Sequence, residues 1–359
     1  MKTLISKLSG LFFLILLAGI PACSQSAPAQ EEGRRLINEL MERDQIPGLS
    51  VTISKDGEFV WSEGFGFTDL EQEVSVIPGK SKFRIGSVSK PLTAMALAIL
   101  YENGSIDLDV AIQKYIPDYP LKSDTFTLRQ LAGHLAGIRH YKNDEFLSGK
   151  HYTNVLDGLT IFQDDPLINK PGTEYSYSSY GWNLISAAIE ISSEIPFLEY
   201  MDSNVFDAMG MEQTYADQVY EIIPGRVRFY AIRDGEVINA PFVDNSYKWA
   251  GGGFISTSED LARFGNVLLT NGLINEQTKS EFLKSQITDD GKKTNYGMGF
   301  RTATDKNGNF WYGHSGGSVG GITMFVVYPD QRMVVTIVTN SSNVRYGSIP
   351  FDLASLFMD

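Results

Sequence analysis

Residues 322–340 read ITMFVVYPDQRMVVTIVTN, two apolar runs separated by a polar segment, PDQR, that is typical of a turn. This pattern predicts a β-hairpin near the end of the chain. Residues 49–66, LSVTISKDGEFVWSEGFG, show a similar pattern near its beginning, with Asp-Gly as the turn. The simplest way to bury both hairpins is to pair them in one antiparallel sheet, and that pairing would decide the fold.

Between the two hairpins the apolar residues recur at three- and four-residue spacing, which indicates helices. The helical segments are residues 91–104, 128–137, 180–192 and 258–272. All but 180–192 end at Gly or Asn-Gly, as helices commonly do. A further short helix is expected over 34–44. Because strands and helices do not alternate regularly, the predicted class is α+β, an antiparallel sheet from both chain ends with a central helical lobe. A catalytic cleft is expected between the sheet and the lobe.

Composition and charge limit the possible functions. The chain has 359 residues, of which 43% are hydrophobic and 20% charged, an ordinary globular composition. Its formal net charge is -13, and no block of Lys and Arg offsets this charge. Such an acidic chain repels the phosphates of nucleic acids, so we expect no nucleic-acid partner.

The first 22 residues have the composition of an export signal, because Lys2 and Lys7 precede the apolar run LFFLILLAGI. Ten helical residues rise about 15 Å, half of what a bilayer core requires, so this run is too short to span a membrane. The signal ends at Cys23, the single cysteine, in IPAC, which resembles the box of bacterial lipoproteins. We therefore expect lipidation of Cys23 and anchoring in the bacterial cell envelope, facing the periplasm or the outer surface. Cleavage nearby, with Cys23 incidental, is the alternative.

The predicted organisation has three parts. Residues 1–22 form the lipoprotein signal peptide, and residues 23–33, which are small, polar and contain proline, form a tether. Residues 34–359 form one folded domain.

A serine and a lysine lie three residues apart in FRIGSVSKPLTAMALAIL, residues 83–100, where a helix is expected to begin. This spacing places Ser87 and Lys90 on one face of the first turn. A serine hydroxyl becomes a strong nucleophile only when a neighbouring base takes its proton, which requires the lysine pKa to fall from about 10.4 towards 7. Burial near other positive charge could lower it. Alternatively, Ser87 caps the helix and Lys90 is a solvated charge.

Two later stretches, taken together with Ser-x-x-Lys, resemble a known motif set. PGTEYSYSSYGW contains Tyr177, and WYGHSGGSVGG contains His314. In this order the three stretches resemble the motifs of the serine β-lactamases and penicillin-binding proteins, most closely the His-x-Gly subgroup of class C-like enzymes, esterases and D-amino-acid peptidases. Longer stretches such as VDNSYKWAGGGFISTSEDLARFGN resemble the LACTB-like branch, and the resemblance covers about residues 34–359.

The resemblance implies a role for each matching residue. Ser87 would attack a carbonyl carbon and become acylated, while Lys90 and Tyr177 would share the proton transfers. The backbone N–H groups of Ser87 and Gly317 would form the oxyanion hole. His314 would hydrogen-bond the substrate or the Tyr177 hydroxyl.

Other residues are expected to bind substrate. Ser179 stands where the family usually has asparagine, and Ser315 and Gly316 follow the histidine of the third motif. Three glycines adjoin Tyr247 and Trp249, which suggests a cleft wall where substrate comes close. Plain packing of these two aromatic residues is the alternative.

Two departures from the family pattern, Ser179 for asparagine and His314 for lysine, weaken the case for efficient β-lactam hydrolysis but leave acyl transfer intact. The first hypothesis is therefore a peptidase acting on a peptide or small acyl substrate through a Ser87 acyl-enzyme. A carboxylesterase or weak β-lactamase with the same site is the nearest alternative. An inactive binding or assembly lipoprotein is the non-enzymatic one. A homo-oligomer is possible by resemblance.

Competing motifs fail on their spacing. Ser315 and Ser318 each fit Gly-x-Ser-x-Gly, but no histidine follows either of them, as an α/β-hydrolase would require. His134, His140 and His151 lack His-Glu-x-x-His spacing, and no second cysteine offers a zinc ligand. We therefore expect neither a metal nor a cofactor.

Overall fold

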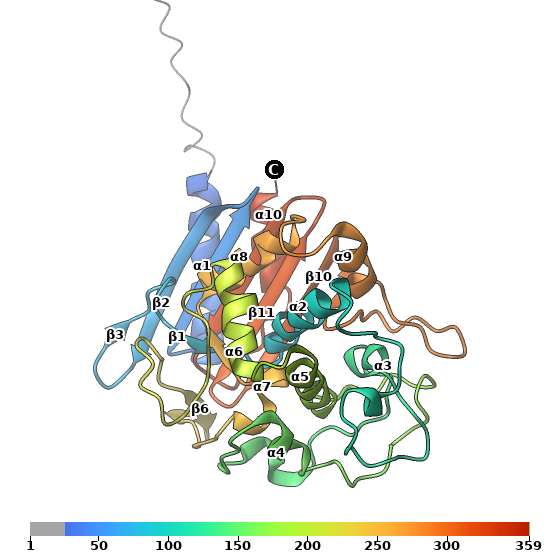
Figure 1. Cartoon of the computed structure of the whole chain (residues 1–359). Coiled ribbons are helices and arrows are strands. Elements are labelled where there is room, and N and C mark those ends of the chain that lie inside the picture. The colour runs from blue at the N-terminus through green and yellow to red at the C-terminus, as the bar shows by residue number, and fades with distance from the viewer. Residues whose placement is uncertain (1–25, 359) are drawn as a thin grey trace, which may run out of the picture.

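The computed structural model describes residues 26–358, which form a seven-stranded antiparallel sheet beside a helical lobe (Figure 1). The strand order is β3-β2-β1-β12-β11-β10-β9. The two predicted hairpins meet where β1 pairs with β12, from Leu49 opposite Thr339 to Lys55 opposite Met333. The predicted α+β class, with a sheet built from both chain ends, is confirmed. The strands are β1 Gly48–Lys55, β2 Glu58–Asp69, β3 Val74–Ser75, β9 Arg301–Thr304, β10 Phe310–Ser318, β11 Gly321–Tyr328 and β12 Met333–Thr339.

Helices cover both faces of the sheet, which explains why all seven residues of β12 are buried. Val335 faces a cluster with α1 (Ser26–Asp44) and α10 (Ile349–Phe357). Val334 faces the opposite cluster, to which α8 (Ser258–Leu268) and the lobe contribute. A strand buried on both faces is expected to be a nearly continuous apolar run, and MVVTIVT has this form.

The helical lobe is organised around α2 (Ser89–Glu102), in which 11 of 14 residues are buried. Helices α5 (Tyr180–Ser193) and α7 (Trp249–Gly252) pack against it. The Thr93 hydroxyl also donates to the Ala250 carbonyl over 3.1 Å. A helix buried on nearly all sides has little freedom to move, so it can hold side chains at its N-terminus in fixed positions.

The remaining elements are short. The helix predicted over 128–137 ends as α3 at Ala132, because the chain reverses through His134, whose φ is +61°. A small sheet of order β4-β8-β5 brings residues 83–84 beside residues 254–256. The short elements are α3 Leu128–Ala132, α4 Val155–Leu159, α6 Phe197–Met201, α9 Glu276–Leu283, β4 Phe83–Arg84, β5 Tyr215–Ala216, β6 Tyr230–Arg233, β7 Glu236–Asn239 and β8 Phe254–Ser256.

Helix α1 begins at Ser26, so the prediction of a tether over 23–33 was wrong from residue 26 onward. The Gln30 amide donates to a backbone carbonyl of β2 over 3.0 Å, and Gly33 lies directly against the Trp61 ring. Arg34 pairs with Glu31, and Arg35 pairs with Glu32, each one turn apart on the exposed face of the helix. This helical turn contacts the sheet through few apolar side chains, which is why its sequence shows no helical periodicity.

Cys23 and the predicted signal peptide lie outside the described residues, so the lipid anchor and the location in the cell envelope stay predictions. Within residues 26–358, no helix has both the length and the apolar character needed to cross a membrane.

The contact between α8 and the sheet makes a prediction for Gly265. A Cβ atom at this position would lie 2.4 Å from Val334 Cγ1 and 2.6 Å from Cγ2. We expect Gly265→Ala to lower the free energy of unfolding by about 1–2 kcal/mol, because the clash outweighs the better helix propensity of alanine. Urea denaturation measures it, with Gly272→Ala as the control, because a Cβ there meets only Thr270 Oγ1 at 3.6 Å. Equal stability of the two variants would contradict this packing.

Candidate active site

Ser87 lies in a 3₁₀ turn, Gly86–Val88, that leads directly into α2. The backbone of this turn lies directly against the backbone of β10. Gly86 has a φ of +50°, and a Cβ atom there would lie 2.7 Å from the Gly317 carbonyl oxygen. Glycine is required at such a position, because other residues rarely adopt this φ and would force the serine away from the strand.

The amine of Lys90 is surrounded by oxygen atoms. It lies 3.2 Å from the Ser87 hydroxyl and 3.0 Å from the Ser179 hydroxyl, and it donates to the Gly251 carbonyl over 2.6 Å. None of these partners is a carboxylate, and the whole side chain is buried. An ammonium ion in this position would therefore be poorly compensated.

The surroundings of Lys90 favour its uncharged form. Burial lowers the pKa of Lys90 well below its usual value, and the positive charges of Lys248 and Arg301 lower it further. An uncharged amine within hydrogen-bond distance of a serine hydroxyl can accept the serine's proton. The arrangement of Ser87 and Lys90 therefore suits nucleophilic catalysis.

Tyr177 contacts Lys90 through its ring, whose centroid is 4.9 Å from the lysine nitrogen. The ring also stacks at a tilt on His134, with 4.3 Å between the centroids. Burial raises the pKa of Tyr177 to about 12, while the neighbouring Ser87 and Ser179 hydroxyls oppose this rise. The phenol therefore keeps its proton at neutral pH and is suited to donate it.

His314 bonds to protein groups through both ring nitrogens. Nε2 accepts from the Tyr296 hydroxyl over 2.9 Å, and Nδ1 donates to the Ser315 carbonyl over 2.6 Å. The expected bond from His314 to the Tyr177 hydroxyl is not formed; the two rings lie 6.2 Å apart. Burial lowers the pKa of His314 to about 3, and the charge of Lys90 adds to this. His314 is thus uncharged, and it holds Tyr296 rather than Tyr177 by a hydrogen bond.

A cavity of about 250 Å³ opens beside the nucleophile. Of the residues predicted from the sequence, Ser87, Ser179 and Gly317 line it. Ser87 and Gly317, whose backbone N–H groups were predicted to form the oxyanion hole, thus both border the same cavity. Ser315, within β10, is exposed, and Gly316 is buried; a Cβ at Gly316 would lie 1.9 Å from the Ile85 carbonyl oxygen, just before the Ser87 turn. Neither residue lines the cavity.

Tyr247 and Trp249, which were predicted to form a cleft wall with the adjoining glycines, do not line this cavity. Tyr247 is 2% and Trp249 5% exposed, and both pack into the core of the lobe. The residue between them, Lys248, lines the cavity together with Gly251 and Gly252. Three consecutive residues in a 3₁₀ turn and the helix that follows it cannot all face one side, and no local pattern indicated which of them would point towards the cavity.

Three further lining residues, His140, Tyr141 and Phe146, come from the loop over residues 139–147, which sequence reasoning did not associate with the site. The Ser179 backbone N–H donates to His140 Nδ1 over 3.1 Å, so the second ring nitrogen of His140 carries the proton. Burial lowers the pKa of His140 to about 4, with the charge of Lys90 as a further cause. His140 therefore offers an uncharged N–H group.

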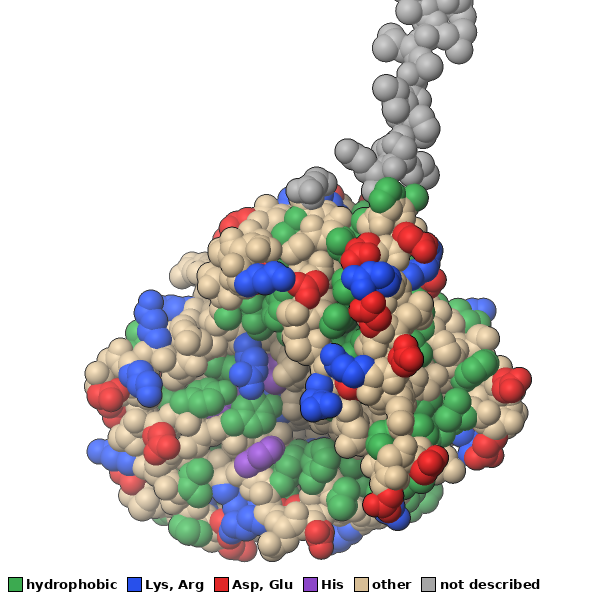
Figure 2. Space-filling model, turned by 180° about the vertical axis from the view of Figure 1, so that it is seen from behind, with side chains coloured by type: hydrophobic (Ala, Val, Ile, Leu, Met, Phe, Trp, Pro, Cys, Tyr) green, Lys and Arg blue, Asp and Glu red, His purple; other side chains and the backbone are tan. Residues whose placement is uncertain are grey.

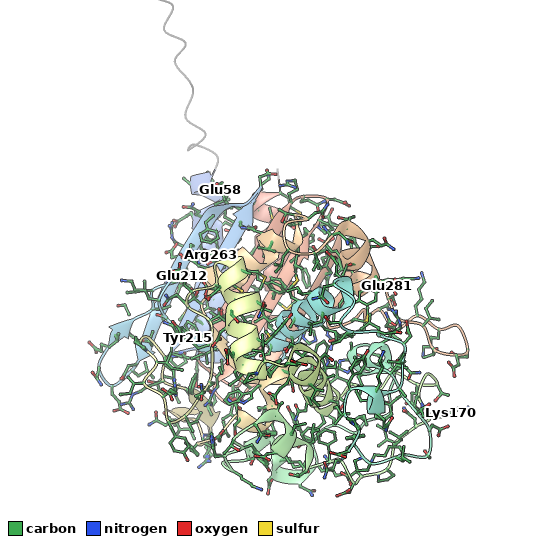
Figure 3. The ribbon with its side chains drawn as sticks, in the orientation of Figure 1. Glu58, Lys170, Glu212, Tyr215, Arg263 and Glu281 are labelled. Atoms are coloured by element: carbon green, nitrogen blue, oxygen red, sulfur yellow. The ribbon has the colours of Figure 1, made fainter. Side chains whose placement is uncertain are left out.

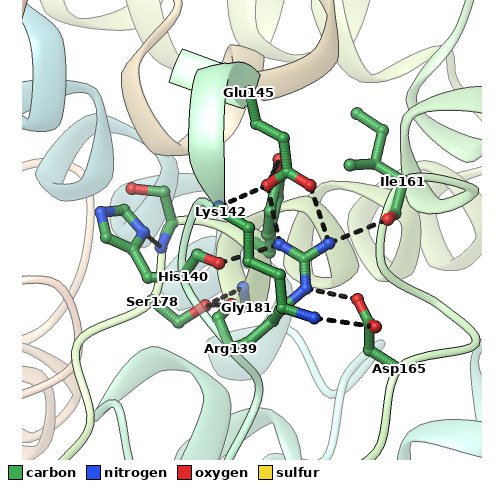
Figure 4. A network of polar contacts seen from close by, with 10 residues as sticks. Arg139, His140, Lys142, Glu145, Ile161, Asp165, Ser178 and Gly181 are labelled. Carbon is green, nitrogen blue, oxygen red and sulfur yellow. Dashed lines mark hydrogen bonds and ion pairs between the residues drawn. The ribbon is translucent and has the colours of Figure 1, made fainter.

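Arg139 fixes this loop in place (Figure 4). Its guanidinium donates to Glu145 over 2.7 and 2.9 Å, and also to Asp165. Its carbonyl accepts from the Ser178 hydroxyl over 2.7 Å, which connects the loop to the start of α5. The loop residues that line the cavity, His140, Tyr141 and Phe146, are thereby connected to the segment that carries Tyr177.

No metal site accompanies these residues. Within residues 26–358, no group of three or more His, Cys, Asp or Glu side chains is placed to hold a metal ion.

The chain matches the family model described as Beta-lactamase over residues 34–352. It belongs to the beta-lactamase family. The members of this family related to it are serine hydrolases, and this chain is a serine hydrolase. The family predicted from the three motifs is therefore confirmed.

Relatives and solved structures agree with this assignment. Human "Serine beta-lactamase-like protein LACTB, mitochondrial" is 30% identical, over 94% of this chain and 81% of the human protein. The octameric penicillin-binding protein homologue from Pyrococcus abyssi has a TM-score of 0.79 at 24% identity, over 91% of this chain and 77% of that one. The D-amino acid amidase from Ochrobactrum anthropi SV3 has a TM-score of 0.78 at 19% identity, over 92% and 99%. The two structures show that the fold is shared.

The Arg139 contacts predict a loss of stability on substitution. Arg139→Met would leave Glu145 and Asp165 without their main counter-ion, and we expect a loss of about 2 kcal/mol because both carboxylates are only a quarter to a third exposed. Lys142→Met is the control, because Lys142 is half exposed and its pair with Asp165 is worth less than about 1 kcal/mol. Urea denaturation compares them. A loss no larger than that of the control would show that Arg139 does not hold the loop.

The buried histidines predict how stability depends on pH. His314 has a pKa of about 3 when folded and about 6.5 when unfolded, so the unfolded chain takes up its proton first as the pH falls. Its contribution to stability is therefore complete above pH 6.5 and is lost progressively below it. We expect His314→Gln to reduce the loss of stability between pH 6.5 and 5.0 by about 1.5 kcal/mol.

Glutamine can keep both bonds of His314, since its amide can accept from Tyr296 and donate to Ser315. Denaturation curves of the wild type and the variant at the two pH values measure the effect. An unchanged pH dependence in the variant would show that His314 takes up its proton equally in the folded and unfolded states.

Proposed function

We propose that this hydrolase cleaves peptide or related amide bonds through an acyl-enzyme on Ser87. One observation carries the proposal: the Ser87 hydroxyl lies 3.2 Å from the amine of a fully buried lysine. A merely structural serine would not need a buried base beside it. The D-amino acid amidase of the same fold, whose name describes an amide as its substrate, supports the choice of leaving group.

In the first step, Lys90 takes the proton of Ser87, and Oγ attacks the carbonyl carbon of the substrate. The negative charge that develops on the carbonyl oxygen is stabilised by the backbone N–H groups of Ser87 and Gly317. As the carbon–nitrogen bond breaks, Tyr177 gives its proton to the leaving nitrogen and receives one from the Lys90 ammonium. An ester between Ser87 and the acyl group remains, and the site is otherwise restored.

In the second step, water releases the acyl group by the reverse route. Lys90 accepts a proton from the attacking water, the tetrahedral intermediate again places its charge on the same two N–H groups, and the proton returns to Ser87 Oγ. The high pKa of Tyr177 and the low pKa of Lys90 divide the two roles, since one group donates and the other accepts at neutral pH.

The same residues would cleave an ester, whose leaving group needs less help from a proton donor. Esters and β-lactams are therefore included as further substrates in the same experiment, because they test the carboxylesterase and weak β-lactamase alternatives. The intact contact between Ser87, Lys90 and Tyr177 argues against an inactive binding module. A homo-oligomer stays a prediction.

We expect a fluorophosphonate to form one adduct with the purified protein, on Ser87, detected by mass spectrometry. Ser87→Ala should form none. Lys90→Met should react at least about 100-fold more slowly, because a positioned base contributes that much to such a reaction. Lys170→Met is the control for loss of a lysine, since Lys170 is exposed at the periphery (Figure 3) and its reaction should keep the wild-type rate.

If the folded wild type forms no adduct, the hydrolase mechanism is wrong and the binding-module hypothesis replaces it. If an adduct forms, rates on peptides, esters and β-lactams distinguish the three substrate classes.

A further inference from the structure

Lys248 lines the same cavity as Ser87, yet the mechanism above does not use it. Its side chain is 2% exposed and lies at the end of the 3₁₀ turn Ser246–Lys248, directly before α7. Its amine lies 4.3 Å from the centroid of the Phe146 ring, with the rings of Tyr247 and Tyr141 at 5.1 and 5.6 Å. Three aromatic rings thus surround one amine.

This amine lacks a partner of opposite charge. Among the described residues, no hydrogen-bond or ion-pair partner is found for the side-chain amine of Lys248. No acidic residue lines the cavity. The nearby carboxylates are already paired, Glu145 with Arg139 and Asp217 with Arg84 over 2.6 Å.

A structural role alone does not account for a lysine here. Burying an unpaired ammonium costs several kcal/mol, and cation–π contacts return about 0.5–2 kcal/mol each. A methionine would fill the same space among the rings without that cost. The site therefore keeps a cation that the folded protein leaves without a counter-ion.

A second positive charge, that of Arg301, acts on the residues of the site. Arg301, at the start of β9, is exposed, and its guanidinium forms no hydrogen bond or ion pair within residues 26–358. Its charge lowers the pKa values of Lys90, Tyr177 and His314. Figure 2 shows Lys, Arg and His side chains around the hollow on this face of the molecule. A chain of net charge -13 thus presents cations at its active site.

We propose that Lys248 binds a carboxylate of the substrate, so that the enzyme prefers acyl substrates that carry a negative charge close to the bond it cleaves. This inference rests on the proposed function, because it assigns the substrate class of the same site. A carboxylate that enters the cavity would form a charge-assisted hydrogen bond with the amine and supply the counter-ion that the protein lacks.

The charge of Lys248 is adjustable near neutral pH. Burial lowers the pKa of Lys248 to about 7, the charge of Arg84 lowers it further, and Asp217 opposes this. Lys90 and His140 are the other titratable groups on which its charge acts; burial lowers the pKa of both, that of His140 to about 4. A bound carboxylate favours the ammonium form. Preference for an anionic substrate is therefore greatest below pH 7 and declines above it.

The test compares two esters that differ only in charge: mono-4-nitrophenyl adipate, which has a free carboxylate, and its neutral methyl ester. The readout is the ratio of kcat/KM for the anionic ester to that for the neutral ester, after subtraction of spontaneous hydrolysis. We expect Lys248→Met to lower this ratio at least tenfold. A ratio cancels any general loss of activity in the variant. Lys170→Met, which removes the same charge far from the cavity, should keep the wild-type ratio.

Two further measurements support or contradict the same inference. In the wild type the ratio should fall as the pH rises from 6 to 8.5, whereas in Lys248→Met it should stay constant. Adipate should protect Ser87 of the wild type from the fluorophosphonate better than the neutral adipamide does. The protection experiment needs no variant, so it decides the question even if Lys248→Met fails to fold.

The outcomes separate this inference from the function on which it rests. If the neutral ester is cleaved and Ser87 is labelled, but the ratio is unchanged in Lys248→Met or adipate protects no better than adipamide, the role of Lys248 is wrong and the hydrolase stands. If wild-type Ser87 is not labelled and neither ester is cleaved, both the hydrolase mechanism and the role of Lys248 are overturned.

Discussion

The burial of the Lys90 amine is the constraint on which the site depends. Its bond of 2.6 Å to the Gly251 carbonyl holds α2 against α7, and its contact with Ser179 holds the start of α5. The same amine that lies beside the nucleophile is thus the point where three helices of the lobe meet. This location excludes water and leaves only neutral oxygen partners, so the amine loses its charge. The same contacts of the Lys90 amine therefore both hold the helices of the lobe together and determine the basicity of this lysine.

Burial also favours the uncharged forms of the ionisable side chains around Lys90. His134 and His314 are buried and held uncharged, and Tyr177 keeps its proton. His314 differs from a lysine at this position because it adds no permanent charge near the base, and it uses both nitrogens to hold Tyr296 and the β10 backbone. The interior of the site is therefore assembled from polar groups in their neutral forms, which a low dielectric tolerates at little cost when they are hydrogen-bonded.

The sequence was informative where a local pattern has a physical cause, and silent where a contact joins distant segments. The apolar runs of the two hairpins predicted the sheet, because strands buried on both faces must be apolar. Ser87 and Lys90 could be paired because three-residue spacing on a helix determines their separation. Nothing local indicated that His314 would bond to Tyr296 rather than to Tyr177, or that Lys248 would face the cavity while Tyr247 faces the core. Such choices depend on how separate elements pack against one another.

The two lysines of the site differ in the form, charged or uncharged, that their surroundings favour. Lys90 lies behind the nucleophile among neutral oxygens, where uncharged amine is the favoured form, whereas Lys248 lies at the cavity among aromatic faces, which attract a cation. The net charge of the surface repels an anion at long range, but salt screens this repulsion over about 8–10 Å. The field of Lys248 acts over a few ångströms inside a cavity without acidic residues, where screening is weak. Repulsion by the surface and attraction by the site therefore act at different distances, and an acidic protein can still favour an anionic substrate at its nucleophile.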